Sequence, residues 1–403
     1  MITLRSSALG AILPALILCP LIGRASPSVN FRGYTLTEYY TFEDAAAKQH
    51  HQLYQTLSFR IERPGPQKFS LVGHARYQGD SSDDFAESGS LKIHNLYARW
   101  ADGRQFDLRL GRQFLAEGVG FGTYDAVRLS FSPVTWGSAT FWGGQAAPTD
   151  REANIRNLDD AKSLGLALRG RLLSRVNITA SLMTEDRGGD PFLRRAGLSA
   201  NADLTKSLYA HGLFYINMSG PSDLHRARLL LRYNPNTRWR LFGEFAAGTP
   251  QLPVDSPFEF VEIETSMLGR LGASYQLTSK YWVGVRAQSF LSGEPSSTLG
   301  LSIESGWGMF GYRQRFGDSG DESGLFGSIR VNPADFMQVY ASAEFSTYQF
   351  EDFDQEDQMA AQAGVKLFPA KALMLDASLQ AMNNEQFDQD LRGLLRIKWS
   401  FAN

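Results

Sequence analysis

The sequence predicts a transmembrane β-barrel, an all-β fold in which antiparallel strands run up and down around a closed cylinder. Three observations predict it. Apolar and polar residues alternate with period two along many segments. The connections between these segments alternate between short turns and long polar loops. The 403-residue chain has a mean hydropathy of −0.25 and no long apolar run beyond its N-terminus, which excludes a bundle of membrane-spanning helices.

The first 25 residues predict a cleaved secretory signal peptide, with Arg5 before an apolar stretch at residues 8–22 and a small-residue exit at residues 23–25. The only cysteine, Cys19, lies inside this segment. The mature chain, residues 26–403, would therefore contain no disulfide, no thiolate metal site and no covalently attached haem. It would be mildly acidic and form one domain, and nothing in its charge pattern indicates a nucleic-acid partner.

The clearest strand is the last one, at residues 391–401. One face carries Leu391, Gly393, Leu395, Ile397, Trp399 and Phe401, and the other face carries Arg396 and Lys398. In a barrel such an apolar face meets lipid and the polar face lines the interior. The same alternation recurs at residues 53–61, 176–182 and 226–233. The seven tryptophans lie mostly near strand ends, where we expect them to anchor the barrel at the membrane interface.

The connections predict the orientation of the barrel. Tight turns are expected at residues 64–66, 101–104, 132–133, 234–236, 278–280, 332–335 and 369–371. Longer loops are expected at residues 79–90, 113–125, 143–162, 248–257, 317–323, 349–358 and 383–390. Short periplasmic turns on one rim and long extracellular loops on the other are typical of the outer membrane.

The number of candidate strands is about 22, and an even number between 16 and 22 is expected. A barrel of 22 strands normally holds a plug in its lumen, but no plug domain precedes the first strand. Three explanations stay open. The true number is nearer 16 or 18, the long loops fold inward, or another protein fills the lumen.

One stretch, residues 96–131 (LYARWADGRQFDLRLGRQFLAEGVGFGTYDAVRLSF), joins two strands through a glycine-rich segment. With the barrel pattern of the whole mature chain, it resembles Gram-negative outer-membrane porins and, more loosely, alginate-export and phosphate-selective porin-like barrels. The resemblance implies a pore, in which the loop at residues 113–125 bends inward and sets the bore. Family members usually end in Phe, whereas here Phe401 is followed by two further residues. Homotrimers are common in the family.

Basic residues dominate the polar faces of the predicted strands. The candidate pore-lining and constriction residues are Arg109, Arg112, Glu117, Asp125, Arg128, Arg226, Arg228, Arg232 and Arg240. A cationic stripe on a low-dielectric wall would enrich anions in the lumen. Alternatively, the arginines pair with carboxylates on neighbouring strands and only solvate the wall.

The sequence therefore predicts a passive, weakly anion-selective diffusion pore in the outer membrane, in contact with lipid and lipopolysaccharide and passing small anionic solutes. No nucleophile, zinc or phosphate-loop motif is present, so neither an enzyme nor a cofactor or metal site is expected. Two alternatives stay open. The barrel could sheathe a multihaem cytochrome in an electron conduit, or it could export or import an anionic polysaccharide.

Overall fold

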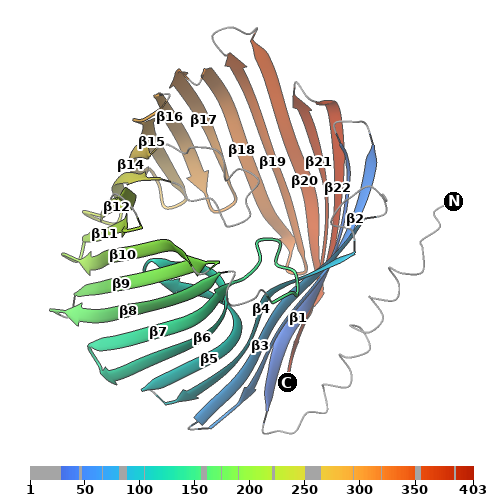
Figure 1. Cartoon of the computed structure of the whole chain (residues 1–403). Helices are drawn as coiled ribbons and strands as arrows, with labels where there is room; N and C mark the ends of the chain where they lie inside the picture. The colour runs from blue at the N-terminus through green and yellow to red at the C-terminus, as the bar shows by residue number, and fades with distance from the viewer. Residues whose placement is uncertain are drawn as a thin grey trace.

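The computed structural model describes residues 29–403 except 45–47, 66, 81–88, 104, 156–160, 174, 189, 220–222, 250–264, 294, 319, 350–354 and 385–386. The predicted signal peptide lies outside the described residues. The described part forms 22 strands (Figure 1): β1 Asn30–Glu43, β2 Gln49–Arg63, β3 Gln67–Asp80, β4 Ser90–Asp102, β5 Phe106–Glu117, β6 Gly120–Val134, β7 Gly137–Ala146, β8 Lys162–Leu172, β9 Val176–Arg187, β10 Asp190–Asp203, β11 Leu208–Asn217, β12 Asp223–Tyr233, β13 Trp239–Gly248, β14 Ser266–Gln276, β15 Tyr281–Phe290, β16 Ser296–Ser305, β17 Gly308–Gly317, β18 Asp321–Ala334, β19 Met337–Gln349, β20 Glu356–Ala370, β21 Leu373–Asn384 and β22 Phe387–Ala402.

Each strand pairs antiparallel with the next one along the chain, and β22 closes the cylinder by pairing with β1. The closing ladder runs from Arg32 opposite Ala402 to Thr41 opposite Gly393, and Figure 1 shows β22 beside the first strands. The prediction of an all-β, up-and-down barrel with about 22 strands is confirmed. Within the described ranges, no helix is both long and apolar enough to span a membrane.

The two faces of the wall differ as the alternation predicts. On β12, Leu229 and Leu231 are exposed on the outer face, while Arg228 and Arg232 point inward. Large apolar side chains are exposed around the whole outer face, among them Leu108, Leu110, Val127, Leu129, Leu164, Leu168, Leu198, Phe214, Phe245, Leu271, Leu299, Leu301, Leu325, Phe345, Leu379 and Leu395. An apolar surface of this extent needs lipid as its solvent, and a closed ladder leaves no unpaired edge in the membrane.

The turns at the short-turn rim start later than expected at four places: Ala101 and Asp102 still belong to β4, and the other three places carry a proline. Pro133, Pro333 and Pro369 belong to the ends of β6, β18 and β20 rather than to turns, so the predicted turns at residues 132–133, 332–335 and 369–371 were misplaced by one to three residues. Each proline lies where the ladder register shifts. Proline has no N–H to donate, and such an irregularity is where a strand tolerates it.

The prediction of a long loop at residues 113–125 is wrong, because most of these residues belong to two strands. Residues up to Glu117 continue β5, and β6 begins at Gly120. Gly118, at a φ of +62°, and Val119 form the tight connection. The left-handed conformation suits glycine, so the glycine-rich sequence makes a hairpin turn rather than an irregular loop.

Candidate functional site

The β5–β6 hairpin leaves the barrel wall. β5 pairs with β4 only as far as Arg112, which lies opposite Leu96. The departure point is Gly111, at a φ of +119°, where an added Cβ would meet the carbonyl oxygen of Leu96. Beyond it, the amide of Phe114 donates to Oδ1 of Asn95 at 3.2 Å instead of to the β4 backbone.

A segment of the β7–β8 connection takes the place of the hairpin beside β4. The amide of Ile93 donates to the carbonyl oxygen of Arg151 at 2.7 Å, and Lys92 forms an isolated antiparallel bridge with Glu152. This segment, residues 147–155, lies at the base of the hairpin, where the amide of Ala147 donates to the carbonyl oxygen of Thr123 at 2.9 Å. The predicted long loop at residues 143–162 therefore contributes a structured strap.

The hairpin packs against the inner face of the next strands and makes a small hydrophobic core inside the barrel. Its members are Leu115, Val119, Tyr124, Ala126, Trp142, Ala167, Met183 and Leu193. The amide of Val119 donates to Oγ of Ser181 on β9 at 3.0 Å. Glycines on the wall leave space for the side chains of this core. A Cβ on Gly165 would collide with the Trp142 ring, and a Cβ on Gly197 would lie 2.5 Å from Cγ1 of Val119.

Arg112 clamps the base of the hairpin to the strap. Its side chain is 5% exposed and makes a bidentate pair with Asp125, with both N···O distances at 2.8 Å. The same guanidinium donates to the carbonyl oxygens of Glu152 at 2.5 Å and Asn154 at 2.9 Å. Arginine suits this position because its planar group carries five donors in a fixed geometry.

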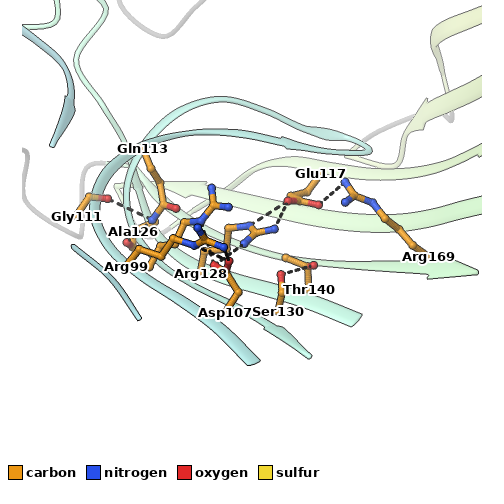
Figure 2. Close-up of polar contacts among 11 residues, drawn as sticks. Arg99, Asp107, Gly111, Gln113, Glu117, Ala126, Arg128, Ser130, Thr140 and Arg169 are labelled. Atoms are coloured by element: carbon orange, nitrogen blue, oxygen red, sulfur yellow. Dashed lines mark hydrogen bonds and ion pairs between the residues drawn. The ribbon is translucent and has the colours of Figure 1, made fainter. Parts of the chain in front are cut away.

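A second charged cluster lies on the inner wall below the hairpin (Figure 2). Asp107 accepts from Arg99 at 2.7 Å and from Arg109 at 3.1 Å, and it lies 3.4 Å from Nη1 of Arg128. Glu117, at the hairpin tip, bridges Arg128 at 2.7 Å and Arg169 at 2.6 Å. The hairpin is thus held by ion pairs as well as by its apolar contacts.

Elsewhere in the lumen, single carboxylates are shared by two basic side chains. These groups are Glu38 with Arg76 and Arg396, Glu244 with Arg228 and Arg270, Glu322 with Arg313 and Arg315, and Asp376 with Lys366 and Arg396. The distances range from 2.5 to 3.9 Å. Arg396 joins the Glu38 and Asp376 groups into one, which keeps one positive charge in excess, as does the Glu244 group. The Glu322 group is balanced, because Arg313 also pairs with Glu344 at 2.7 Å.

The structure places the predicted site residues in the Asp107 cluster, in the clamp, and on β12 and β13. Arg109, Arg128 and Glu117 belong to the Asp107 cluster, whereas Arg112 is buried and Asp125 half-buried in the clamp. Arg228 pairs with Glu244, and Arg240 stacks on Trp282 with its guanidinium carbon 3.9 Å from the ring centroid. Among the described residues, Arg226 and Arg232 have neither an ion-pair nor a hydrogen-bond partner.

Two features of the site were missed from the sequence. The strap at residues 147–155 supplies backbone carbonyls, which have no sequence signature. Trp142 was expected at the membrane interface but lies in the internal core, 3% exposed. The period-two alternation could have predicted this position, because Trp142 lies opposite Arg128 and Gly165 and so shares their inward face.

We expect Asp107→Asn to make the pore more anion-selective. Neutralising this carboxylate leaves Arg99 and Arg109 without their acidic partner and raises the positive potential beside the hairpin. The anion-to-cation permeability ratio should rise roughly twofold, measured as the reversal potential in a KCl gradient. Asp335→Asn, in a turn at the short-turn rim, is the matched control. An unmoved reversal potential in the Asp107 variant would contradict the assignment of this cluster to the conducting path.

No family model matches the chain, and no curated protein matches it. Solved structures of other proteins do match it. OccAB1 of Acinetobacter baumannii is 12% identical over 93% of this chain and 97% of its own, with a TM-score of 0.45. OpdO of Pseudomonas aeruginosa is 10% identical over 93% and 97%, with a TM-score of 0.48. The outer membrane protein opdK of Pseudomonas aeruginosa is 10% identical over 93% of this chain and 99% of its own, with a TM-score of 0.46.

With identities of 12% or less and TM-scores below 0.5, these proteins assign this chain neither a substrate nor a partner. The class follows from the molecule itself. A closed antiparallel barrel with an apolar outer face, short turns on one rim and a charged interior has the architecture of an outer-membrane-type transmembrane β-barrel.

Proposed function

We propose that the protein is a passive diffusion pore with a weak preference for anions. The observation that supports this most directly is the excess of basic over acidic side chains in two ion-pair groups of the lumen. Glu244 is shared by Arg228 and Arg270, and the group that contains Glu38 and Asp376 has three basic side chains, so both groups stay positive. A low-dielectric wall focuses that field into the lumen, where it raises the local concentration of anions.

The arc of wall formed by β12 and β13 adds further positive charge. Arg226 and Arg232 are unpaired among the described residues, and Arg240 stacks on an aromatic ring, which does not neutralise its charge. Anions passing along this arc would meet guanidinium groups able to form bidentate hydrogen bonds. Screening by salt keeps the preference weak at physiological ionic strength.

The internal core supports a small-solute pore over a sheath for another protein. The hairpin and its contacts with β7–β10 occupy lumen space that a cytochrome would need. The same contacts support the second of the three sequence-based explanations for an unplugged wide barrel, inward folding of its own long connections. The proposed mechanism is therefore permeation, with no chemical step assigned to any side chain.

Charge reversal on the β12–β13 arc tests the selectivity. We expect the mature chain in a planar bilayer to show stable openings and an anion-leaning reversal potential under a KCl gradient. Arg232→Glu combined with Arg240→Glu should lower the anion-to-cation permeability ratio by roughly twofold or more. Lys371→Glu, at the short-turn rim outside the barrel interior, should change it little. A cation-selective wild type, or no difference between the double variant and the control, would refute the proposal.

A further inference from the structure

A cavity of about 620 Å³ lies inside the barrel at the hairpin tip, among the ends of β9–β12 that face the long-loop rim. The hairpin contributes residues 118–119 and 121–124, the end of β7 contributes Ala146, and the strap contributes residues 147–149 and Arg151. Its size falls within the range of small-molecule sites. A purely passive pore gives no reason for a partly enclosed cavity beside the inward hairpin.

The polar side of the cavity is built by an irregularity in β12. The ladder with β11 shifts register after Tyr215, which pairs with Arg226, so that His225 becomes an extra, unpaired residue. As a result, two successive side chains, His225 and Arg226, both line the cavity. β-bulges commonly redirect side chains in this way at binding sites. Nδ1 of His225 is buried and has no hydrogen-bond partner.

Three guanidinium groups, those of Arg151, Arg195 and Arg226, line the cavity together with one carboxylate, Glu185. Arg195 is 9% exposed and its Nε donates to Oδ1 of Asn217 at 3.2 Å, so this group is held in place. Glu185 is 5% exposed. The cavity therefore carries a net charge of about +2, which a doubly charged anion would balance better than a single carboxylate. A phosphate monoester has a charge near −2 and three acceptor oxygens.

The opposite side of the cavity is aromatic. Phe121 is 70% exposed and Phe192 is 40% exposed, and Tyr124 and Tyr215 also line the cavity. Exposed phenyl rings in an otherwise charged interior offer flat apolar surfaces to a ligand. Thr123 and the buried Nδ1 of His225 can hydrogen-bond hydroxyl groups at the edge of such a ligand.

We propose that this cavity binds a phosphorylated monosaccharide, which builds on the proposed pore by giving it a saturable site. The phosphate lies between Arg226 and the guanidinium groups of Arg151 and Arg195. The apolar face of the sugar ring packs on Phe121. Glu185 and His225 accept or donate hydrogen bonds at the hydroxyl groups.

Calorimetric titration of the detergent-purified, folded barrel tests the site. Glucose 6-phosphate should bind at least about tenfold more tightly than glucose, inorganic phosphate or glucuronate. If inorganic phosphate binds as tightly as glucose 6-phosphate, the proposed contacts with the sugar ring are refuted. If glucuronate binds as tightly as glucose 6-phosphate, the proposed preference of the cavity for a doubly charged anion is refuted. No binding of glucose 6-phosphate would overturn the whole inference.

Matched variants locate the binding. Arg226→Gln and Phe121→Ala should each weaken glucose 6-phosphate binding by about tenfold. Arg330→Gln removes an inward guanidinium from β18, and Phe114→Ala removes the other ring of the Phe114–Phe121 edge-to-face pair. Neither control residue lines the cavity, so both should bind like the wild type. Heat-modifiable migration on gels confirms that each variant is folded, and equal losses in variants and controls would refute the location.

Bilayer recordings on the same preparations separate this inference from the proposed function. Glucose 6-phosphate should reduce the KCl current with the concentration dependence found by calorimetry. Normal conductance without binding would refute the sugar-phosphate site and leave the pore standing. Binding without any conductance would support the site and refute the pore.

Discussion

Removal of the inward hairpin will raise the single-channel conductance. In this variant Gln113 is joined to Tyr124, its partner across the β5–β6 ladder, through an Asn-Gly turn that replaces residues 114–123. The lost segment includes Leu115 and Val119, which are 1% and 2% exposed in the internal core. The open cross-section grows, and we expect conductance to increase roughly twofold or more, measured in planar bilayers.

A point substitution checks that the effect comes from the hairpin and not from a damaged barrel. Leu115→Asp places a carboxylate in an apolar core and should detach the hairpin without shortening the chain. Leu115→Met keeps the packing and is the control. If the deletion and Leu115→Asp both conduct like the wild type while remaining folded, the hairpin does not narrow the conducting path.

Arg112→Ala will destabilise the barrel by about 3–5 kcal/mol, the usual cost of removing one partner from a buried ion pair. Asp125, whose side chain is 13% exposed, loses its bidentate partner, and the carbonyls of the strap lose their donor. Urea unfolding of the barrel in lipid vesicles, followed by tryptophan fluorescence, measures the change. The current should also become noisier, because the strap is no longer fixed.

Removing both charges separates the ion pair from the strap contacts. Arg112→Ala with Asp125→Ala should recover part of the lost stability, since no buried carboxylate is left unpaired. Arg112→Lys keeps the charge but cannot reproduce the bidentate geometry, so its loss should be intermediate. A free energy of unfolding within about 1 kcal/mol of the wild type for Arg112→Ala would show that the clamp is not a stabilising feature.

The barrel itself follows from local patterns. Period-two alternation needs only neighbouring residues, so Leu395 and Arg396 could be assigned to opposite faces before any pairing was known. The strand count followed from repeating that assignment along the chain. Turn positions failed where Pro133, Pro333 and Pro369 lie at the ends of strands, because a proline gives the same local signal in a turn and in a strand-end irregularity.

The site depends on contacts that no local pattern contains. Val119 reaches Ser181, 62 residues away, and Arg112 binds carbonyl oxygens 40 and 42 residues away. The resemblance to porins implied an inward segment at residues 113–125, and the structure places a hairpin there. The identity of its supports, an apolar core and a backbone strap, follows from long-range packing. The cavity behind the hairpin needs in addition the register shift at Tyr215, which the sequence does not mark.

The departure of the hairpin also shapes the cylinder. Where β5 and β6 turn inward, two strands leave the circumference and one strap beside β4 replaces them. Adjacent strands lie about 4.8 Å apart, so the perimeter near the long-loop rim shortens by about one strand spacing. A solute that enters from the long-loop side therefore meets the inward hairpin first, and one that returns from the short-turn side meets it last.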